Sequence, residues 1–215
     1  MPNSDIAEII NVYDSKIVRA YCWARFKIMH QRFLDEIGQY LPQTGQILDM
    51  GCGFGLFSLY YARKFPGLSI LGIDVQEKRI QMARRAAMLL SLSNVSYEIA
   101  DAATYEYSAH LDGAYMLDIV HHISPAQVVT LIKKISSLLN LGSRLIIKDV
   151  KTDPAYKLWF TYLLDKLVDP RSDLNYWKEQ DMAELLSRSG FEVFRHSMVD
   201  ILPYSHILYI CQKKV

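Results

Sequence analysis

The spacing of hydrophobic residues along the chain changes near residue 46. Upstream, apolar side chains recur every three or four residues over 15–40, which predicts one long helix. From residue 46 onward, short apolar runs alternate with longer stretches of helical spacing. The runs predict strands at 46–50, 68–73, 95–99, 112–118 and 143–149, and the stretches predict helices near 55–65, 76–91 and 125–139.

This alternation predicts the class of fold. Strands that are apolar throughout, separated by helices, are typical of a parallel sheet covered on both faces. Because crossover connections between parallel strands are right-handed, we expect a doubly wound α/β sheet. The last two strand-like segments, 191–199 and 206–213, are joined by a short turn around Pro203 and Tyr204. So short a connection permits only an antiparallel hairpin, and the sheet is expected to end with one antiparallel strand.

Composition limits the function classes. The chain has 215 residues, of which 51% are hydrophobic and 22% charged, as in ordinary globular domains. Its net charge of +1 argues against a protein that holds nucleic acid through many phosphate contacts. One local basic cluster, Lys78, Arg79, Arg84 and Arg85, keeps that alternative open.

Cysteine usage and the absence of long apolar runs predict the compartment. The three cysteines, Cys22, Cys52 and Cys211, lie far apart, and no CxxC pair or histidine at zinc-ligand spacing accompanies them. We therefore expect neither a disulfide framework nor a metal site. No run of 18 apolar residues and no signal-peptide pattern is found, so we expect no transmembrane segment and a cytoplasmic location.

Residues 47–58 read ILDMGCGFGLFS, an apolar strand followed by three alternating glycines and a helix. Glycines at 51, 53 and 55 let the backbone turn sharply and approach a ligand closely. The dinucleotide fingerprint requires a glycine where this chain has Leu56, and no nucleoside triphosphate loop is present. A purely structural tight turn is the competing interpretation.

Acidic residues stand at or near the ends of the first three predicted strands, at Asp49, Asp74 and Asp101. Asp74, about 20 residues beyond the loop, is placed to accept hydrogen bonds from ribose hydroxyls. The carboxylate of Asp101 can accept from an adenine amine, and the backbone N–H of Ala102 can donate to the ring. Any one acid can be a helix cap, but three in register favour an adenosine attached to a cationic group.

The segments ILDMGCGFG, GID, IADA and DGAYMLDIVHHIS resemble the successive motifs of class I S-adenosylmethionine-dependent methyltransferases over residues 46–150. Within this family, the segments most resemble the small-molecule group that includes ubiquinone and menaquinone methyltransferases. The resemblance implies a seven-stranded, mostly parallel sheet with one antiparallel strand. It also implies S-adenosylmethionine as cofactor, S-adenosylhomocysteine as product, and a small, hydrophobic or aromatic acceptor of lipid, quinone or polyketide type.

The resemblance also implies roles for single residues. Gly51, Gly53 and Gly55 would line the methionine and ribose, with Cys52 between them, and Asp49 would lie near the amino group. Asp74 with Val75 would hold the ribose, Asp101 with Ala102 the adenine, and Leu117 with Asp118 the methionine side. The N-terminal segment often closes over the cofactor in this family, which assigns Tyr13 and Arg19. A helix cap and an exposed basic residue are the alternatives there.

Methyl transfer from a sulfonium is an in-line displacement that needs alignment and, for weakly acidic nucleophiles, a general base. His121 and His122 follow the fourth predicted strand, and Asp149 ends the fifth. These three are the catalytic candidates, although a histidine here can equally cap a helix or pack structurally.

Residues 154–168, PAYKLWFTYLLDKLV, place Tyr156, Trp159, Phe160 and Leu163 at helical spacing. A stripe facing the core is the plain interpretation, and a roof over an apolar acceptor is the alternative.

One domain over 1–215 is expected, with an N-terminal helical cap (1–45), a cofactor-binding core (46–150), a helical substrate-side insertion (151–190) and a terminal hairpin (191–215). A nucleic-acid methyltransferase and a non-catalytic cofactor-binding partner subunit remain the competing functions.

Overall fold

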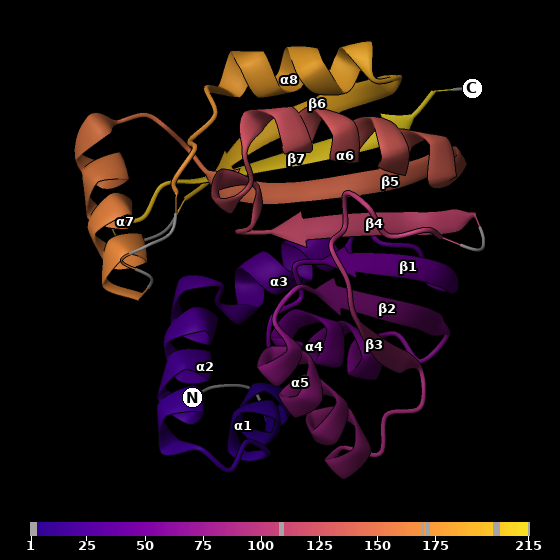
Figure 1. The fold of residues 1–215 in the computed structure, drawn as a ribbon, viewed down its shortest axis with the longest axis vertical. Helices are drawn as coiled ribbons and strands as arrows, with labels where there is room; N and C mark the ends of the chain where they lie inside the picture. Colours follow the sequence, from indigo (N-terminus) through magenta and orange to yellow (C-terminus); the bar gives the residue numbers. More distant parts are fainter. Residues whose placement is uncertain (1–3, 108–109, 169, 171–172, 200–202, 215) are drawn as a thin grey trace. The chain divides into compact units, whose positions relative to one another are not determined.

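The computed structural model describes residues 4–107, 110–168, 170, 173–199 and 203–214 (Figure 1). Its strands follow the order β3-β2-β1-β4-β5-β7-β6 in a seven-stranded sheet. This agrees with the predicted mixed α/β fold. The strands are β1 (Gly45–Met50), β2 (Leu68–Asp74), β3 (Val95–Ile99), β4 (Leu111–Leu117), β5 (Leu139–Val150), β6 (Phe191–Met198) and β7 (His206–Lys213).

The chain divides into two compact units. Unit 1 comprises residues 1–106 with 111–113, and unit 2 comprises 107–110 with 114–215. Whether the whole chain acts as the single domain expected from the sequence stays a prediction. Within the described residues, no helix is both long enough and apolar enough to cross a membrane.

Unit 1 contains the parallel strands β1, β2 and β3, with Asp49 opposite Gly72 and Asp74 opposite Ile99 in the register. Parallel strands end at the same edge, so the loops that follow them in the chain also gather there. Two helices come after β1 and β2, and three precede the sheet. They are α4 (Leu56–Lys64), α5 (Glu77–Leu89), α1 (Ser4–Asn11), α2 (Lys16–Ile28) and α3 (Gln31–Gly38).

The prediction of one helix over 15–40 is wrong, because the segment forms α2 and α3 with a break between them. Ser15 begins α2 by accepting a hydrogen bond from the Val18 amide, and the backbone of His30 is extended (φ −65°, ψ 164°). Met29, at the break, is fully buried. The apolar spacing therefore continues across a point where the helix axis ends, which hides the break from a pattern analysis. The sequence analysis also did not anticipate α1.

Unit 2 contains β5, β7 and β6, with β7 antiparallel to both neighbours. The strand predicted at the end of the chain is thus the antiparallel one, but it lies between β5 and β6 in the sheet. Ser124 caps α6 (Pro125–Leu138), and Pro125 occupies its first turn, where a missing N–H costs nothing. The other helices are α7 (Ala155–Val168) and α8 (Glu179–Arg188), with a 3₁₀ turn at Val120–His122.

Helix α7 stands beside the strand ends of unit 2, apart from the helices that cover the sheet (Figure 1). The plain interpretation of its aromatic stripe as core is wrong, since Tyr156, Trp159, Phe160 and Leu163 are all exposed. The helix buries Thr161 instead, whose hydroxyl donates to the Lys157 carbonyl (3.0 Å). Helical spacing shows which residues share a face, but it does not show which face is turned inward.

Candidate active site

The glycine loop of unit 1 connects β1 to α4 through three residues in the left-handed region. The φ angles are 72° at Gly51, 56° at Gly53 and 79° at Gly55. The amides of Gly51 and Cys52 both donate to the Ile73 carbonyl, at 2.9 and 3.0 Å. Only glycine adopts this backbone readily, so the three positions are glycine for a conformational reason.

Gly55 and Gly53 differ in the space that surrounds their backbone. A Cβ on Gly55 would lie 2.5 Å from the hydroxyl oxygen of Tyr97, so Gly55 is needed for packing. A Cβ on Gly53 would have no atom within 4 Å among the described residues, so this position borders open space. A backbone without a side chain beside open space suits close approach by a ligand. The loop therefore fits the cofactor that the resemblance implies.

Asp74 fixes this loop. Its Oδ2 accepts from the Gly53 amide at 2.9 Å, and its Oδ1 accepts from the Gln76 amide at 2.8 Å. The side chain is buried, as is that of Asp49 on the neighbouring strand, whereas Val75 is exposed. No sequence pattern predicts the bond between Asp74 and the loop backbone, because only the folded chain brings Gly53 to the end of β2. Its predicted contact with the ribose stays a prediction.

Asp101 is exposed and begins a turn. Its Oδ1 accepts from the Ala103 amide at 2.8 Å, and its carbonyl accepts from the amides of Thr104 and Tyr105. The capping role considered for this residue is therefore present. Ala102, inside the same turn, is half-buried, and the adenine contact expected of the pair stays a prediction.

The N-terminal segment contacts the loop through Tyr13. Its hydroxyl donates to the Phe54 carbonyl at 2.7 Å, and the Phe54 ring also meets Tyr21 (centroids 5.4 Å apart) and the Arg79 guanidinium (5.5 Å). Burial raises the pKa of Tyr13 far above its usual range, so the hydroxyl stays a donor. Arg19 donates to the Asp14 carbonyl at 3.2 Å, close to its own helix start.

The cysteines are unsuited to nucleophilic chemistry. Burial raises the pKa of the Cys22 thiol to about 12 and that of Cys211 further. Cys52, inside the loop, is also kept protonated, first by burial and then by the nearby carboxylates of Asp49 and Asp74. Because the thiolate is the reactive form, Cys52 can take part in packing or ligand contact but not in covalent catalysis.

In unit 2, Leu117 is buried at the end of β4, and the backbone of Asp118 then turns into the left-handed region (φ 56°). Its amide donates to the Lys148 carbonyl at 2.8 Å, and its carboxylate pairs with the fully buried Lys148 ammonium. A non-glycine residue with positive φ is held there by its surroundings, and such positions cluster at functional sites.

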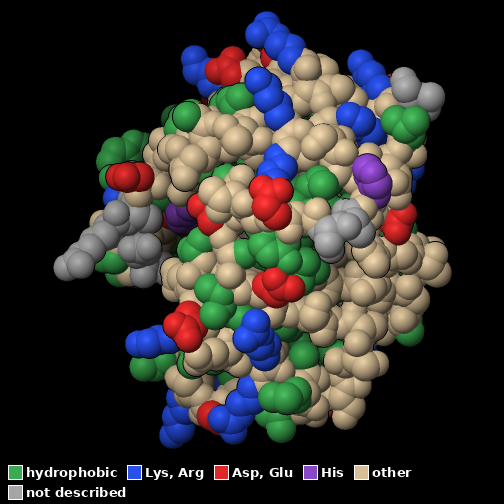
Figure 2. Space-filling view, turned by 45° about the vertical axis from the view of Figure 1, so that its right-hand side comes forward, with side chains coloured by type: hydrophobic (Ala, Val, Ile, Leu, Met, Phe, Trp, Pro, Cys, Tyr) green, Lys and Arg blue, Asp and Glu red, His purple; other side chains and the backbone are tan. Residues whose placement is uncertain are grey.

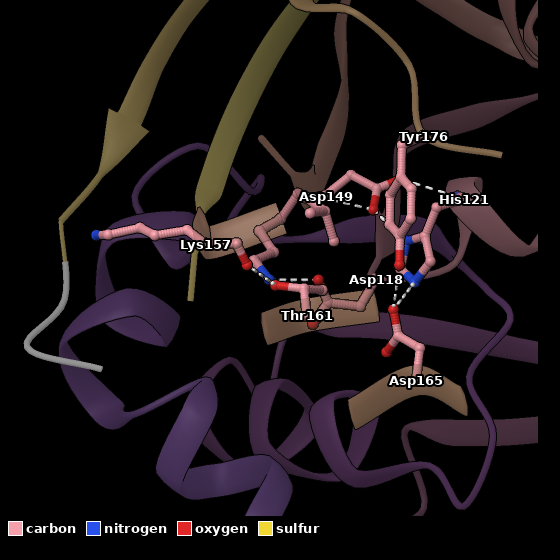
Figure 3. A network of polar contacts seen from close by, with 9 residues as sticks. Asp118, His121, Asp149, Lys157, Thr161, Asp165 and Tyr176 are labelled. Carbon is pink, nitrogen blue, oxygen red and sulfur yellow. Dashed lines mark hydrogen bonds and ion pairs between the residues drawn. The ribbon is translucent and has the colours of Figure 1, made fainter. Parts of the chain in front are cut away.

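His121 and Asp149 form a buried pair in unit 2 (Figure 3). The imidazole Nδ1 contacts Asp149 Oδ1, and the His121 backbone amide donates to Asp149 Oδ2 at 3.1 Å. The Val150 amide adds a further bond to Asp149 Oδ1 at 2.8 Å. The structure therefore joins two of the three catalytic candidates by hydrogen bonds, and Asp149 orients the ring of His121.

Two residues outside the predicted catalytic set complete this cluster. Asp165 Oδ2 lies 3.5 Å from His121 Nε2 and accepts from the Tyr176 hydroxyl at 2.9 Å (Figure 3). The Tyr176 ring stacks on the imidazole with centroids 5.6 Å apart. Asp165 sits in the aromatic segment and Tyr176 just before α8. No motif marks either residue, so only the fold reveals them.

The charge of His121 follows from these neighbours. Burial lowers its pKa, but the carboxylates, with Asp149 foremost, outweigh burial and raise it above 6.5. With a carboxylate near each ring nitrogen, the cluster fits an imidazolium that donates at both positions. His122 is exposed, its ring 4.2 Å from that of His121.

The same cluster has metal-ligand geometry. Ligand atoms of His121, His122 and Asp165 lie within 4.8 Å of one another, a set that can also hold a divalent cation. A protonated imidazole accounts for the arrangement of the two carboxylates without a metal ion.

Comparison with known proteins shows which family this part of the chain resembles. Residues 47–142 match the family model described as "Methyltransferase domain". Residues 47–142 therefore form a methyltransferase domain of the class I type. This methyltransferase domain contains the glycine loop, Asp74, Asp101 and both histidines, and the predicted fold and the predicted cofactor type agree with the family.

Three proteins illustrate the similarity. (S)-Coclaurine N-methyltransferase of Papaver somniferum is 29% identical over 104 residues, which are 48% of this chain and 29% of that protein. An O-methyltransferase of Penicillium expansum is 29% identical over 131 residues, 59% of this chain and 46% of that protein. The crystal structure of magnesium protoporphyrin IX methyltransferase from Synechocystis PCC 6803, with bound S-adenosylhomocysteine, has a TM-score of 0.68 at 22% identity, covering 96% of this chain and 93% of that one.

The methyltransferase domain is thus shown, while the chain spans less than half of the two curated relatives. The roles of individual site residues stay predictions.

Proposed function

We propose that the protein transfers the methyl group of S-adenosylmethionine to a small, hydrophobic or aromatic metabolite and releases S-adenosylhomocysteine. The observation that carries this proposal is Gly53, which borders open space while Asp74 holds its amide, inside a methyltransferase domain. One relative is named as an N-methyltransferase of (S)-coclaurine, a small molecule, and another as an O-methyltransferase, and these names support the acceptor class.

The residues of unit 1 would hold the cofactor, which supplies a methyl group on a positively charged sulfur. Gly51, Gly53 and Gly55 keep side chains away from it, and Asp74 keeps the loop in one conformation. Asp49 and Asp101 offer carboxylates to its amino and adenine groups. A preorganised loop binds without first paying the entropy of ordering itself.

The cluster of unit 2 would manage the proton that an acceptor hydroxyl or amine loses. Asp149 holds His121 in one orientation, and Asp165 with Tyr176 stabilises its charged form. His121 itself is only 2% exposed, whereas His122 is exposed beside it. We therefore propose that His122 meets the acceptor and that His121 and Asp149 tune the proton affinity of the site.

Glycine substitutions test the cofactor loop. Gly53→Ala should weaken S-adenosylhomocysteine binding at least tenfold in calorimetry, because a methyl group would fill the space that the ligand needs. Gly142→Ala is the matched control, since Gly142 also has positive φ (80°) and also has open space around a Cβ. Both substitutions place a β-carbon on a left-handed backbone (φ 56° and 80°), so equal affinities for the two would overturn the assignment of the loop. Tighter binding of NAD than of S-adenosylhomocysteine by the wild type would overturn it as well.

The nucleic-acid alternative loses support from the basic cluster itself. The Arg84 guanidinium donates twice to the Tyr97 carbonyl, at 2.9 and 2.7 Å, and Arg85 pairs with Asp14 at 2.8 Å. On the face shown in Figure 2, Lys and Arg side chains are interspersed with acidic and hydrophobic ones. Binding of RNA or DNA that falls steeply with salt would restore this alternative.

A further inference from the structure

Helix α7 is rich in apolar residues, and it turns a row of large apolar side chains outward. The α7 stripe is Tyr156, Trp159, Phe160, Leu163 and Leu167, which are 66%, 64%, 37%, 57% and 79% exposed. Their spacing of three and four residues places all five within an arc of about 100° on the helix. The other face carries the buried Thr161 and the carboxylate of Asp165, which reaches His121 and Tyr176 (Figure 3). Five large apolar side chains exposed in one row on a helix form a candidate interaction surface, even though the row is small.

The charges of α7 indicate the chemistry of the partner. The acid of the helix, Asp165, is turned toward the cluster. The helix also carries two basic residues, Lys157 and Lys166, which are not members of this cluster. In Figure 3 the side chain of Lys157 extends away from the cluster. Long lysine stems can lie along an apolar surface while their ammonium groups reach a polar layer. Aromatic residues with flanking lysines are typical of helices that lie in a membrane interface.

The size of the stripe argues against a second copy of the chain as the partner. Helix α7 has 14 residues. It is therefore about 21 Å long, and one face about 10 Å wide offers roughly 200 Å². A stable dimer needs about 800 Å² from each partner. A lipid surface has no such requirement, because affinity there comes from insertion of a few side chains and from charge attraction.

We propose that the α7 stripe docks the protein onto an anionic lipid surface. Trp159 and its neighbours enter the boundary between headgroups and acyl chains, and Lys157 and Lys166 meet anionic headgroups. This goes beyond the proposed methyl transfer, and it would bring the enzyme to hydrophobic acceptors held in a bilayer. Docking is measurable without cofactor or acceptor, so its failure and the failure of the proposed function are distinguishable.

Vesicle flotation of the full chain tests the proposal. We expect binding to vesicles of phosphatidylglycerol with phosphatidylcholine, and at least tenfold weaker binding to phosphatidylcholine alone. The double variant Trp159→Ala/Leu163→Ala should lose at least tenfold in binding, and Lys157→Glu/Lys166→Glu should remove the preference for anionic lipid. Trp23→Ala is the matched control, because Trp23 is an exposed tryptophan (53%) on α2. Its binding should equal that of the wild type.

Fluorescence adds a second measurement, since the chain has three tryptophans. Vesicles should shift the emission of the wild type and of Trp23→Ala to shorter wavelength, but not that of Trp159→Phe. All substituted stripe residues are exposed, so unchanged melting temperatures are expected. Absence of binding in the wild type would overturn the proposal. So would equal losses in Trp23→Ala and the stripe variant, or a dimer that only the stripe variant abolishes.

Discussion

The glycine loop of unit 1 and the acid–histidine cluster of unit 2 are built on opposite plans. The loop works mainly through its backbone, with left-handed glycines and an amide fixed by Asp74. The cluster works through side chains, which come from four separate places in the chain. A backbone site tolerates few substitutions at its glycines, and distant segments support it through single contacts such as those of Asp74 and Tyr13. A side-chain site depends on every element that carries a member.

Among substitutions that test this comparison, we expect the largest effect on the free energy of unfolding in the acid–histidine cluster. Asp149→Ala removes the carboxylate that accepts from the His121 ring and amide, and leaves a buried imidazolium short of a partner. Loss of one member of a buried charged pair costs about 3–5 kcal/mol. Urea unfolding should show this loss. The exposed pair Glu184–Arg188 gives the control, where Glu184→Ala should cost no more than about 0.5 kcal/mol. A similar small cost for Asp149→Ala would mean that the cluster does not hold charge.

In the loop, Asp74→Ala should weaken S-adenosylhomocysteine binding by about 1–3 kcal/mol, as expected for lost hydrogen bonds to a charged group. The carboxylate holds the Gly53 and Gln76 amides, so part of this loss comes from a loosened loop. Asp74→Asn keeps one acceptor oxygen and should lose less. Calorimetry on both variants, with the exposed Asp14→Ala as control, would refute the assignment if all three bind equally well.

A smaller effect is expected at the rim of the cluster. Tyr176→Phe keeps the stacked ring and removes only the hydroxyl that donates to Asp165. One such bond contributes about 0.5–1.5 kcal/mol. Thermal and urea unfolding would measure it, and Tyr162→Phe on the exposed side of α7 serves as control. A loss as large as that of Asp149→Ala would show that Tyr176, rather than Asp149, organises the histidine.

The smallest effect is a pH slope with opposite signs for stability and activity. The pKa of His121 is raised in the folded chain, so its stabilising contribution is complete below about pH 6.5. That contribution is lost as the pH rises through the folded pKa. If the neutral imidazole tunes proton removal from the acceptor, activity should rise over the same window. Unfolding curves between pH 6 and 9 test the first part, and His121→Gln should flatten the slope. A slope that persists in His121→Gln belongs to another group.

The strands illustrate what the sequence can predict about this fold. The predicted strand 68–73 differs from β2 by one residue, and 206–213 coincides with β7. Each is an apolar run with clear breaks on both sides, so local composition determines it. Helix α8 was not singled out, because its charged segment buries only Met182 and Leu186 and shows little apolar patterning.

In the candidate site, too, some residues can be predicted from local sequence and others cannot. The glycines, Asp74 and His121 lie in short motifs, whereas Asp165 and Tyr176 reach His121 only because α7 turns its polar face inward. The direction in which a helix faces depends on tertiary packing, which a periodic pattern does not contain. For that reason the spacing predicts a core stripe on α7 and gives no sign of the acid on the opposite face.

The place of β7 in the sheet has a consequence for synthesis on the ribosome. β7 is translated after β5 and β6, yet it supplies the antiparallel ladder to both of them. Until residues 206–213 have left the exit tunnel, β6 has no neighbour in the strand order and the adjoining edge of β5 stays open. Unpaired strand edges of this kind attract other chains. The nascent protein therefore completes unit 2 in a single late step, while the strands β1, β2 and β3 can pair long before.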